Sequence, residues 1–102
     1  MNIKYYYNED TADIYVEGII DASSSSELNT KFQEIMSNPS IKNVNLDLKN
    51  VESINSSGIG KILRFYKYID GIGGEFKIVH VSDRLFEVFR DINLDKIISI
   101  SK

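Results

Sequence analysis

Apolar and polar residues alternate near the N-terminus and again in the middle of the chain. Two β-rich runs, Ile3 to Tyr7 and Ala12 to Glu17, are separated by the polar residues 8–11, which predicts a β-hairpin. Further along, "VNLDL" (44–48) alternates apolar and polar residues and predicts a strand with one apolar face. A parallel strand with helices on both faces would be apolar almost throughout, so we expect helices mainly on one face of the sheet.

Three helices are predicted where apolar residues recur at helical spacing. The predicted stripes are Leu28, Phe32, Ile35 and Met36; then Ile59, Ile62, Leu63, Tyr66 and Ile69; then Leu85, Phe86, Phe89 and Ile92. Ser24 and Glu27 have the spacing of a capping box at the first helix, and Pro39 follows its predicted end. The glycines of "DGIGGE" end the second helix, and Ser82 is the expected N-cap of the third.

The elements follow one another as β-β-α-β-α-β-α, with "EFKIVHV" as the fourth strand and "KIISIS" as a short last strand. Strands that alternate with helices indicate the α/β class and right-handed crossovers into a largely parallel sheet behind the hairpin. The chain has 102 residues and no linker or repeat, so we expect a single domain over residues 1–102.

Composition excludes several classes of function. The formal net charge is −3 and Lys and Arg form no long run, which argues against a nucleic-acid partner. Apolar runs are only a few residues long and the N-terminus lacks the apolar centre of a signal peptide, so we expect no membrane partner and a cytoplasmic protein. The absence of cysteine excludes disulfides and thiolate zinc sites.

The segment "NSSGIG", Asn55 to Gly60, lies between the central predicted strand and the second helix. Ligand sites and anions favour this position in α/β sheets, at the carboxyl end of a strand and the positive end of a helix. Asn55, Ser56 and Ser57 can all act as N-caps. Capping does not require Gly58 and Gly60, which indicate close approach by a partner or, for Gly58, a tight turn or helix-to-sheet packing.

Enzymatic and cofactor chemistry is not favoured at this segment. A P-loop would need glycine where Asn55 stands and serine or threonine where Ile62 follows Lys61. His80 is the only imidazole, and its place at the end of a predicted strand is more typical of a structural or solvated residue. Neither a metal-ligand set nor calcium-loop spacing is present, so we expect no cofactor and no metal.

A serine hydroxyl at a helix N-terminus can instead accept a phosphoryl group from another protein. The phosphoryl group adds ~2 negative charges, which the free N–H groups of the helix accommodate and which repel a docked partner. Lys61, Arg64 and Lys67 follow on the same helix as the rim of a docking surface or as a solvated face. Asp21 is either an acidic neighbour of Ser56 or a turn and capping residue.

These residues resemble the anti-sigma factor antagonists of the STAS domain family. "SINSSGIGKIL" (53–63) is similar to the family's Asp-Ser-Ser-Gly-Leu-Gly segment, and "VEGIIDASSSSEL" (16–28) is similar to its Gly-x-Leu-Asp segment. "VNLDLKNVESIN" (44–55) matches the strand before the motif, and "IGGEFKIVHVSDRLFEVFRDINLDKII" (72–98) matches the glycine turn, strand and helix after it. The resemblance covers nearly the whole chain and implies a STAS-type mixed sheet.

The resemblance also implies a function and site residues. The chain would capture an anti-sigma factor of the serine kinase type and so free a sigma factor. Phosphorylation of Ser56 would switch this binding off, and a protein phosphatase would reverse it, with ATP bound by the kinase. The implied switch and binding residues are Asp21, Asn55, Ser57, Gly58, Gly60, Lys61 and Arg64.

The chain departs from the family pattern at Asn55, where the family usually has aspartate. The neutral amide tolerates a neighbouring phosphate better than a carboxylate, but a kinase that reads the carboxylate would lose recognition. The alternative function is therefore an unphosphorylated STAS scaffold or accessory subunit in a stress-signalling or lipid-transport assembly. A second alternative is a small nucleotide-binding domain. We expect a monomer or a weak dimer.

Overall fold

Five strands form one sheet in the computed structural model, which describes residues 1–102. The strands are β1 (Asn2–Asn8), β2 (Thr11–Ile20), β3 (Asn43–Ile54), β4 (Phe76–Val79) and β5 (Ser99–Ile100), side by side in chain order. β1 and β2 pair antiparallel, and β2 to β5 run parallel. The predicted N-terminal hairpin, the mixed and largely parallel sheet and the α/β class are confirmed.

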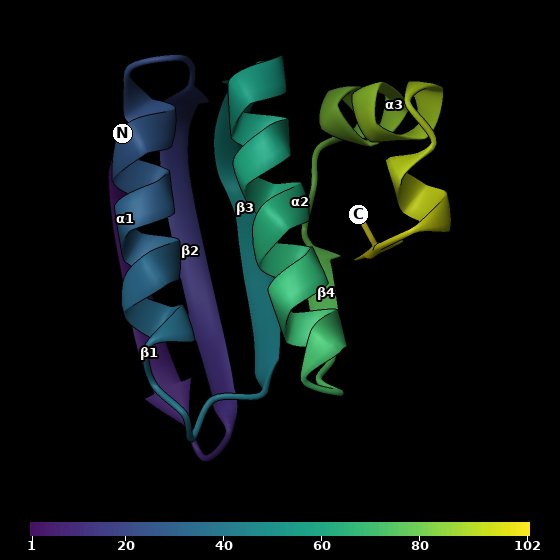
Figure 1. The fold of residues 1–102 in the computed structure, drawn as a ribbon. Coiled ribbons are helices and arrows are strands. Elements are labelled where there is room, and N and C mark those ends of the chain that lie inside the picture. The colour runs from purple at the N-terminus through teal and green to yellow at the C-terminus, as the bar shows by residue number, and fades with distance from the viewer.

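The helices connect the parallel strands and lie on one side of the sheet (Figure 1). They are α1 (Ser24–Met36), α2 (Ser56–Gly71) and α3 (Asp83–Asp91), with a short 3₁₀ helix at Leu94–Lys96. α1 and α2 lie next to each other over the sheet, and α3 lies beyond α2 on the side of β4 and β5 (Figure 1). No helix combines the length and the apolar character that crossing a membrane requires.

The core lies between this face of the sheet and the helices. Buried sheet residues include Ala12, Ile14, Val16, Val44, Leu46, Leu48, Phe76 and Ile78, which alternate along their strands with exposed or half-buried neighbours, and Ile20 and Val51 are buried further along β2 and β3. The ring of Phe65 on α2 lies 4.4 Å from that of Phe32 on α1 and 5.3 Å from that of Phe76 on β4. The predicted one-faced sheet follows from this alternation, because side chains on a strand point to opposite faces in turn.

Two of the predicted apolar stripes are displaced in the structure. The buried side of α2 is Gly58, Ile62, Phe65 and Ile69, whereas Ile59, Leu63 and Tyr66 are only partly buried. Phe65, missing from the predicted stripe, is fully buried at the centre of the core. Ile92, predicted to be in the stripe of α3, is 50% exposed because it caps the end of that helix rather than extending its buried side.

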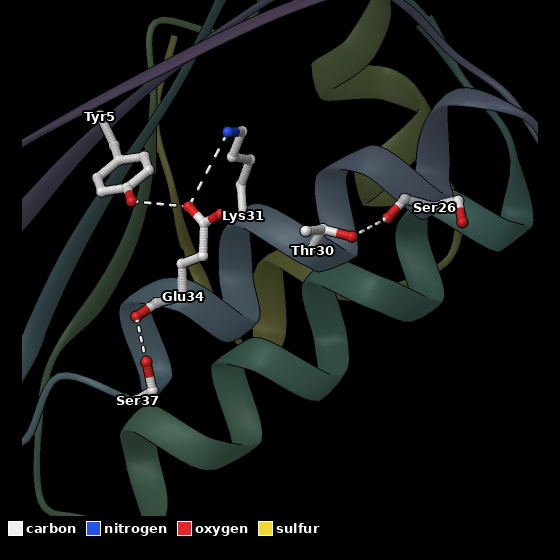
Figure 2. Close-up of polar contacts among 6 residues, drawn as sticks. All are labelled: Tyr5, Ser26, Thr30, Lys31, Glu34 and Ser37. Carbon is white, nitrogen blue, oxygen red and sulfur yellow. Dashed lines mark hydrogen bonds and ion pairs between the residues drawn. The ribbon is translucent and has the colours of Figure 1, made fainter.

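A polar contact joins β1 to α1 at one side of the sheet (Figure 2). The Tyr5 hydroxyl donates to the Glu34 carboxylate at 2.7 Å, and the Lys31 ammonium lies 3.9 Å from the same oxygen. The hydrogen bond to Glu34 is the main cause that raises the pKa of Tyr5 to about 12, because ionised Tyr5 would lose this bond and face the carboxylate charge.

We expect the stabilising effect of Tyr5 to disappear in strong alkali. Because the pKa is raised from 10.0 to about 12 on folding, the contribution is fully present below pH 10 and is lost as the pH rises through about 12. The difference in unfolding free energy between the wild type and Tyr5→Phe should therefore shrink across this window. Urea unfolding of both proteins at a series of pH values measures it.

Tyr6→Phe is the matched control, since Tyr6 is 58% exposed. Its unfolding free energy should follow that of the wild type across the same pH range. A Tyr5→Phe difference that stays constant up to the highest pH would contradict the prediction.

Candidate functional site

The predicted site lies where β2 and β3 end at the same edge of the sheet. The two strands pair up to Ile20 and Ile54, and the Asn55 amide donates to the Ile20 carbonyl at 3.0 Å. Asp21 comes directly after β2, and Asn55 comes directly after β3. The structure therefore brings together the two loops from which Asp21, Asn55 and Ser56 come.

Asn55 is the N-cap of α2. Its backbone is extended, with φ −99° and ψ 177°, and its side-chain oxygen accepts a hydrogen bond from the Gly58 amide at 3.0 Å. The predicted capping role of Asn55 is confirmed. Since an aspartate oxygen can accept the same bond, the amide changes the charge at this position and not the cap.

The two serines of the segment have different surroundings. The Ser57 hydroxyl lies 2.9 Å from the hydroxyl of Ser25 on α1, which is only 2% exposed. Ser56 is the first residue of α2, is exposed, and its hydroxyl has no hydrogen-bond partner within the chain. Of the pair, Ser56 therefore presents its hydroxyl freely at the surface, while Ser57 joins α2 to α1.

Asp21 caps the start of α1. One oxygen of its carboxylate accepts hydrogen bonds from the backbone amides of Ser23 and Ser24, each at 3.0 Å, and from the Ser23 hydroxyl at 2.9 Å. These bonds, first among them the one from the Ser24 amide, hold the pKa of Asp21 below its usual value. Of the two interpretations of Asp21, the one as a turn and capping residue is confirmed.

The predicted capping box of Ser24 and Glu27 is wrong. The N-cap residue is Ser23, whose side chain makes no capping bond, and Ser24 is already the first residue of α1. The Ser24 hydroxyl instead donates to the Ile19 carbonyl at 2.8 Å. Of the two amides that the capping box was expected to serve, those of Ser24 and Glu27, the Ser24 amide donates to the carboxylate of Asp21 instead.

The two glycines of the segment serve different purposes. A β-carbon on Gly58 would lie 2.4 Å from Ile20 Cγ2 and 3.0 Å from Ile54 Cγ1, so Gly58 allows α2 to pack closely on the strand ends. A β-carbon on Gly60 would meet no atom within 4 Å. Helix-to-sheet packing thus explains Gly58, and nothing inside the chain requires glycine at position 60.

The basic residues of α2 have no acidic partner in the chain. Arg64 and Lys67 are exposed, Lys61 is half-buried, and none of the three takes part in an ion pair. Ser56, Gly60, Arg64 and Lys67 share the outer side of α2, since residues three, four, eight and eleven positions apart lie on one helix face. This side of α2 is thus a continuous surface. It consists of the exposed Ser56, the backbone at Gly60, and the unpaired cations of Arg64 and Lys67.

His80 does not belong to this surface. Its Nδ1 lies 2.7 Å from the carboxylate of Asp47, and 61% of its side chain is exposed. Asp47 precedes the end of β3 by seven residues, which is roughly 20 Å along a strand. No imidazole is therefore placed to act as a base on Ser56.

Together, the fold and the site define a small α/β domain that presents an unpartnered serine at the start of a helix. The model of the STAS domain family matches residues 2–102, and the chain belongs to this family. It is 28% identical to the anti-sigma-B factor antagonist of Bacillus subtilis (strain 168), over 99% of this chain and 91% of that protein.

Solved structures show the same fold. A crystal structure of TM1081 from Thermotoga maritima has a TM-score of 0.89 at 25% identity and covers 98% of this chain and 86% of that one. The Bacillus cell fate determinant SpoIIAA in its phosphorylated form has a TM-score of 0.78 at 15% identity, over 99% of this chain and 92% of that one. The STAS-type fold predicted from the sequence is confirmed.

Proposed function

We propose that this protein is an anti-sigma factor antagonist of the cytoplasm, which binds an anti-sigma factor of the serine kinase type and is switched off by phosphorylation of Ser56. The observation that carries the proposal is the free Ser56 hydroxyl at the exposed start of α2, next to a Ser57 that is held by Ser25. The similarity to the antagonist of Bacillus subtilis supports the binding role.

The docking surface in this proposal is the outer side of α2. Gly60 leaves the backbone open to close approach, Arg64 and Lys67 supply positive charge without an acidic partner in the chain, and the half-buried Lys61 flanks this side. An anti-sigma factor that presents carboxylates would be oriented by these cations. Ser56 begins this surface, so a change at Ser56 acts directly on the contact.

A phosphoryl group on Ser56 would be tolerated by the domain and rejected by the partner. The positive end of α2 stabilises the ~2 negative charges of the phosphate, and the Ser56 side chain makes no hydrogen bond within the chain that the modification would break. Asn55 adds no charge of its own beside the phosphate. The partner would meet new negative charge and bulk at its contact, and a phosphatase would restore binding.

Phosphorylation tests the proposal directly. We expect incubation with the cognate kinase and ATP to modify the wild type at Ser56, as mapped by mass spectrometry, and to leave Ser56→Ala unmodified. Ser57→Ala is the matched control and should still be modified at Ser56. Modification at another residue, or none with an active kinase, would count against the switch.

A second candidate function is an unphosphorylated STAS scaffold, and Asn55 is the residue that favours it. The amide preserves the cap of α2 but lacks the charge that a kinase could read. Asn55→Asp distinguishes the two functions in the same assay. A kinase that modifies only the aspartate variant would favour the scaffold for the natural chain.

A further inference from the structure

β1 forms an open edge of the sheet. It pairs with β2 alone, and none of its residues takes part in a backbone hydrogen bond outside that pair. In an antiparallel pair every second residue directs its N–H and C=O away from the partner strand. Figure 1 shows β1 at the margin of the sheet, so these groups face outward. The opposite edge, β5, is only two residues long.

The edge lacks the features that usually prevent pairing with another strand. β1 pairs with β2 over seven consecutive residues without a register shift, and it contains no proline. Lys4 is its only charged residue. Edges of this length are commonly protected by bulges, prolines or several charges, so β1 is ready to accept a further strand.

We propose that β1 pairs antiparallel with β1 of a second copy of this chain, with Tyr5 opposite Tyr5, so that two sheets become one. This register places Lys4 opposite Tyr6, Ile3 opposite Tyr7 and Asn2 opposite Asn8. No like charges face each other, and the Lys4 ammonium meets an aromatic ring at two symmetric positions. The pairing also covers Tyr6 and Tyr7, which are 58% and 44% exposed.

The neighbouring helix is compatible with this arrangement. α1 contacts the edge through Tyr5 and Glu34, and Lys31 lies beside that carboxylate (Figure 2). A twofold axis at Tyr5 brings this part of α1 toward α1 of the second copy. Each helix then contributes one cation, Lys31, and one anion, Glu34. The helices therefore add no net like-charge repulsion to the strand pairing.

The dimer should be weak and concentration-dependent, because one strand pair buries less than the ~1,200 Å² of a standard interface. In sedimentation equilibrium we expect the average mass to rise toward that of a dimer as concentration increases. Tyr6→Lys should raise the dissociation constant about 2- to 30-fold, because the new lysine of each copy would face Lys4 of the other copy. The dimer would then contain two pairs of opposed like charges. Adding Lys4→Glu should restore the affinity.

The variants are chosen to keep the fold. Tyr6 lies opposite Asp13 of β2, so a lysine there gains an acidic neighbour within its own chain. Ile72→Lys, at an exposed position at the end of α2, is the control and should associate as the wild type does. A chain that stays monomeric at all concentrations, or a dimer that Tyr6→Lys leaves unchanged, would overturn the proposal.

Cross-linking tests the register itself, because the natural chain has no cysteine. Lys4→Cys and Tyr6→Cys, mixed and oxidised, should form a disulfide-linked heterodimer, since the Cα atoms of directly opposed residues lie ~4.5–5.5 Å apart, within the range that a disulfide spans. Each variant alone should cross-link far less. Equal cross-linking in the separate and mixed samples would exclude this register.

Discussion

Replacing Ser56 with glutamate is expected to weaken binding of the anti-sigma factor by at least about 100-fold and to leave the fold intact. In the proposed function, a fixed negative charge at the start of the docking surface would oppose a partner that presents carboxylates to Arg64 and Lys67, and like-charge contacts at interfaces cost several kcal/mol. A 100-fold loss corresponds to only ~2.7 kcal/mol. Calorimetry measures the loss of affinity, and urea unfolding measures whether the fold keeps its stability.

The position of Ser56 at the start of α2 predicts how Ser56→Glu changes the unfolding free energy. Glutamate in the first turn of α2 interacts favourably with the helix dipole, so the unfolding free energy should stay equal or rise by ~0.3–1 kcal/mol. Ser56→Gln has nearly the same shape without the charge and separates repulsion from steric exclusion. Full binding by Ser56→Glu, or equal losses in both variants, would contradict a charge-based switch.

Gly58→Ala is expected to destabilise the protein by ~1–3 kcal/mol. The new β-carbon would lie 2.4 Å from Ile20 Cγ2, a branch next to the backbone of a residue that is only 1% exposed, so α2 or the strand must move. Each kcal/mol lowers the melting temperature by ~4–8 °C in a domain of this size. Thermal and urea unfolding measure the loss.

Gly60→Ala is the matched control for this prediction. The same substitution two residues later meets no atom within 4 Å and should stabilise α2 by up to ~1 kcal/mol through helix propensity. The two glycine variants should therefore change stability in opposite directions. Equal effects would show that propensity, and not contact with Ile20 and Ile54, governs position 58.

Much of the fold could be predicted from the sequence because its signals are local. The alternation around Val44, Leu46 and Leu48 defines a strand with one buried face, whatever it pairs with. Alternating strands and helices then leave few topologies, because crossovers between parallel strands are right-handed. The capping role of Asn55 was also predictable, because a cap depends on a few adjacent residues.

Other predictions failed where several interpretations of one local pattern compete. Ser24 and Glu27 fit a capping box, yet the carboxylate of Asp21 takes the amides of Ser23 and Ser24. The stripe of α2 was placed to one side of its true centre, and Phe65 was missed. The buried residues of α2 are Gly58, Ile62, Phe65 and Ile69, which have regular helical spacing. Because glycine has no apolar side chain, the first of these positions does not stand out in the sequence.

The order of the elements, the apolar face of the sheet and the serine pair at the start of a helix can be read from local patterns, since each depends on residues close together in the chain. Which serine has a free hydroxyl and which glycine is needed for packing depend on contacts between elements that are far apart in the chain. Ser25 lies 32 residues before Ser57, and Ile20 lies on a different strand from Ile54. Such contacts depend on how strands and helices pack, and spacing along the chain does not encode them.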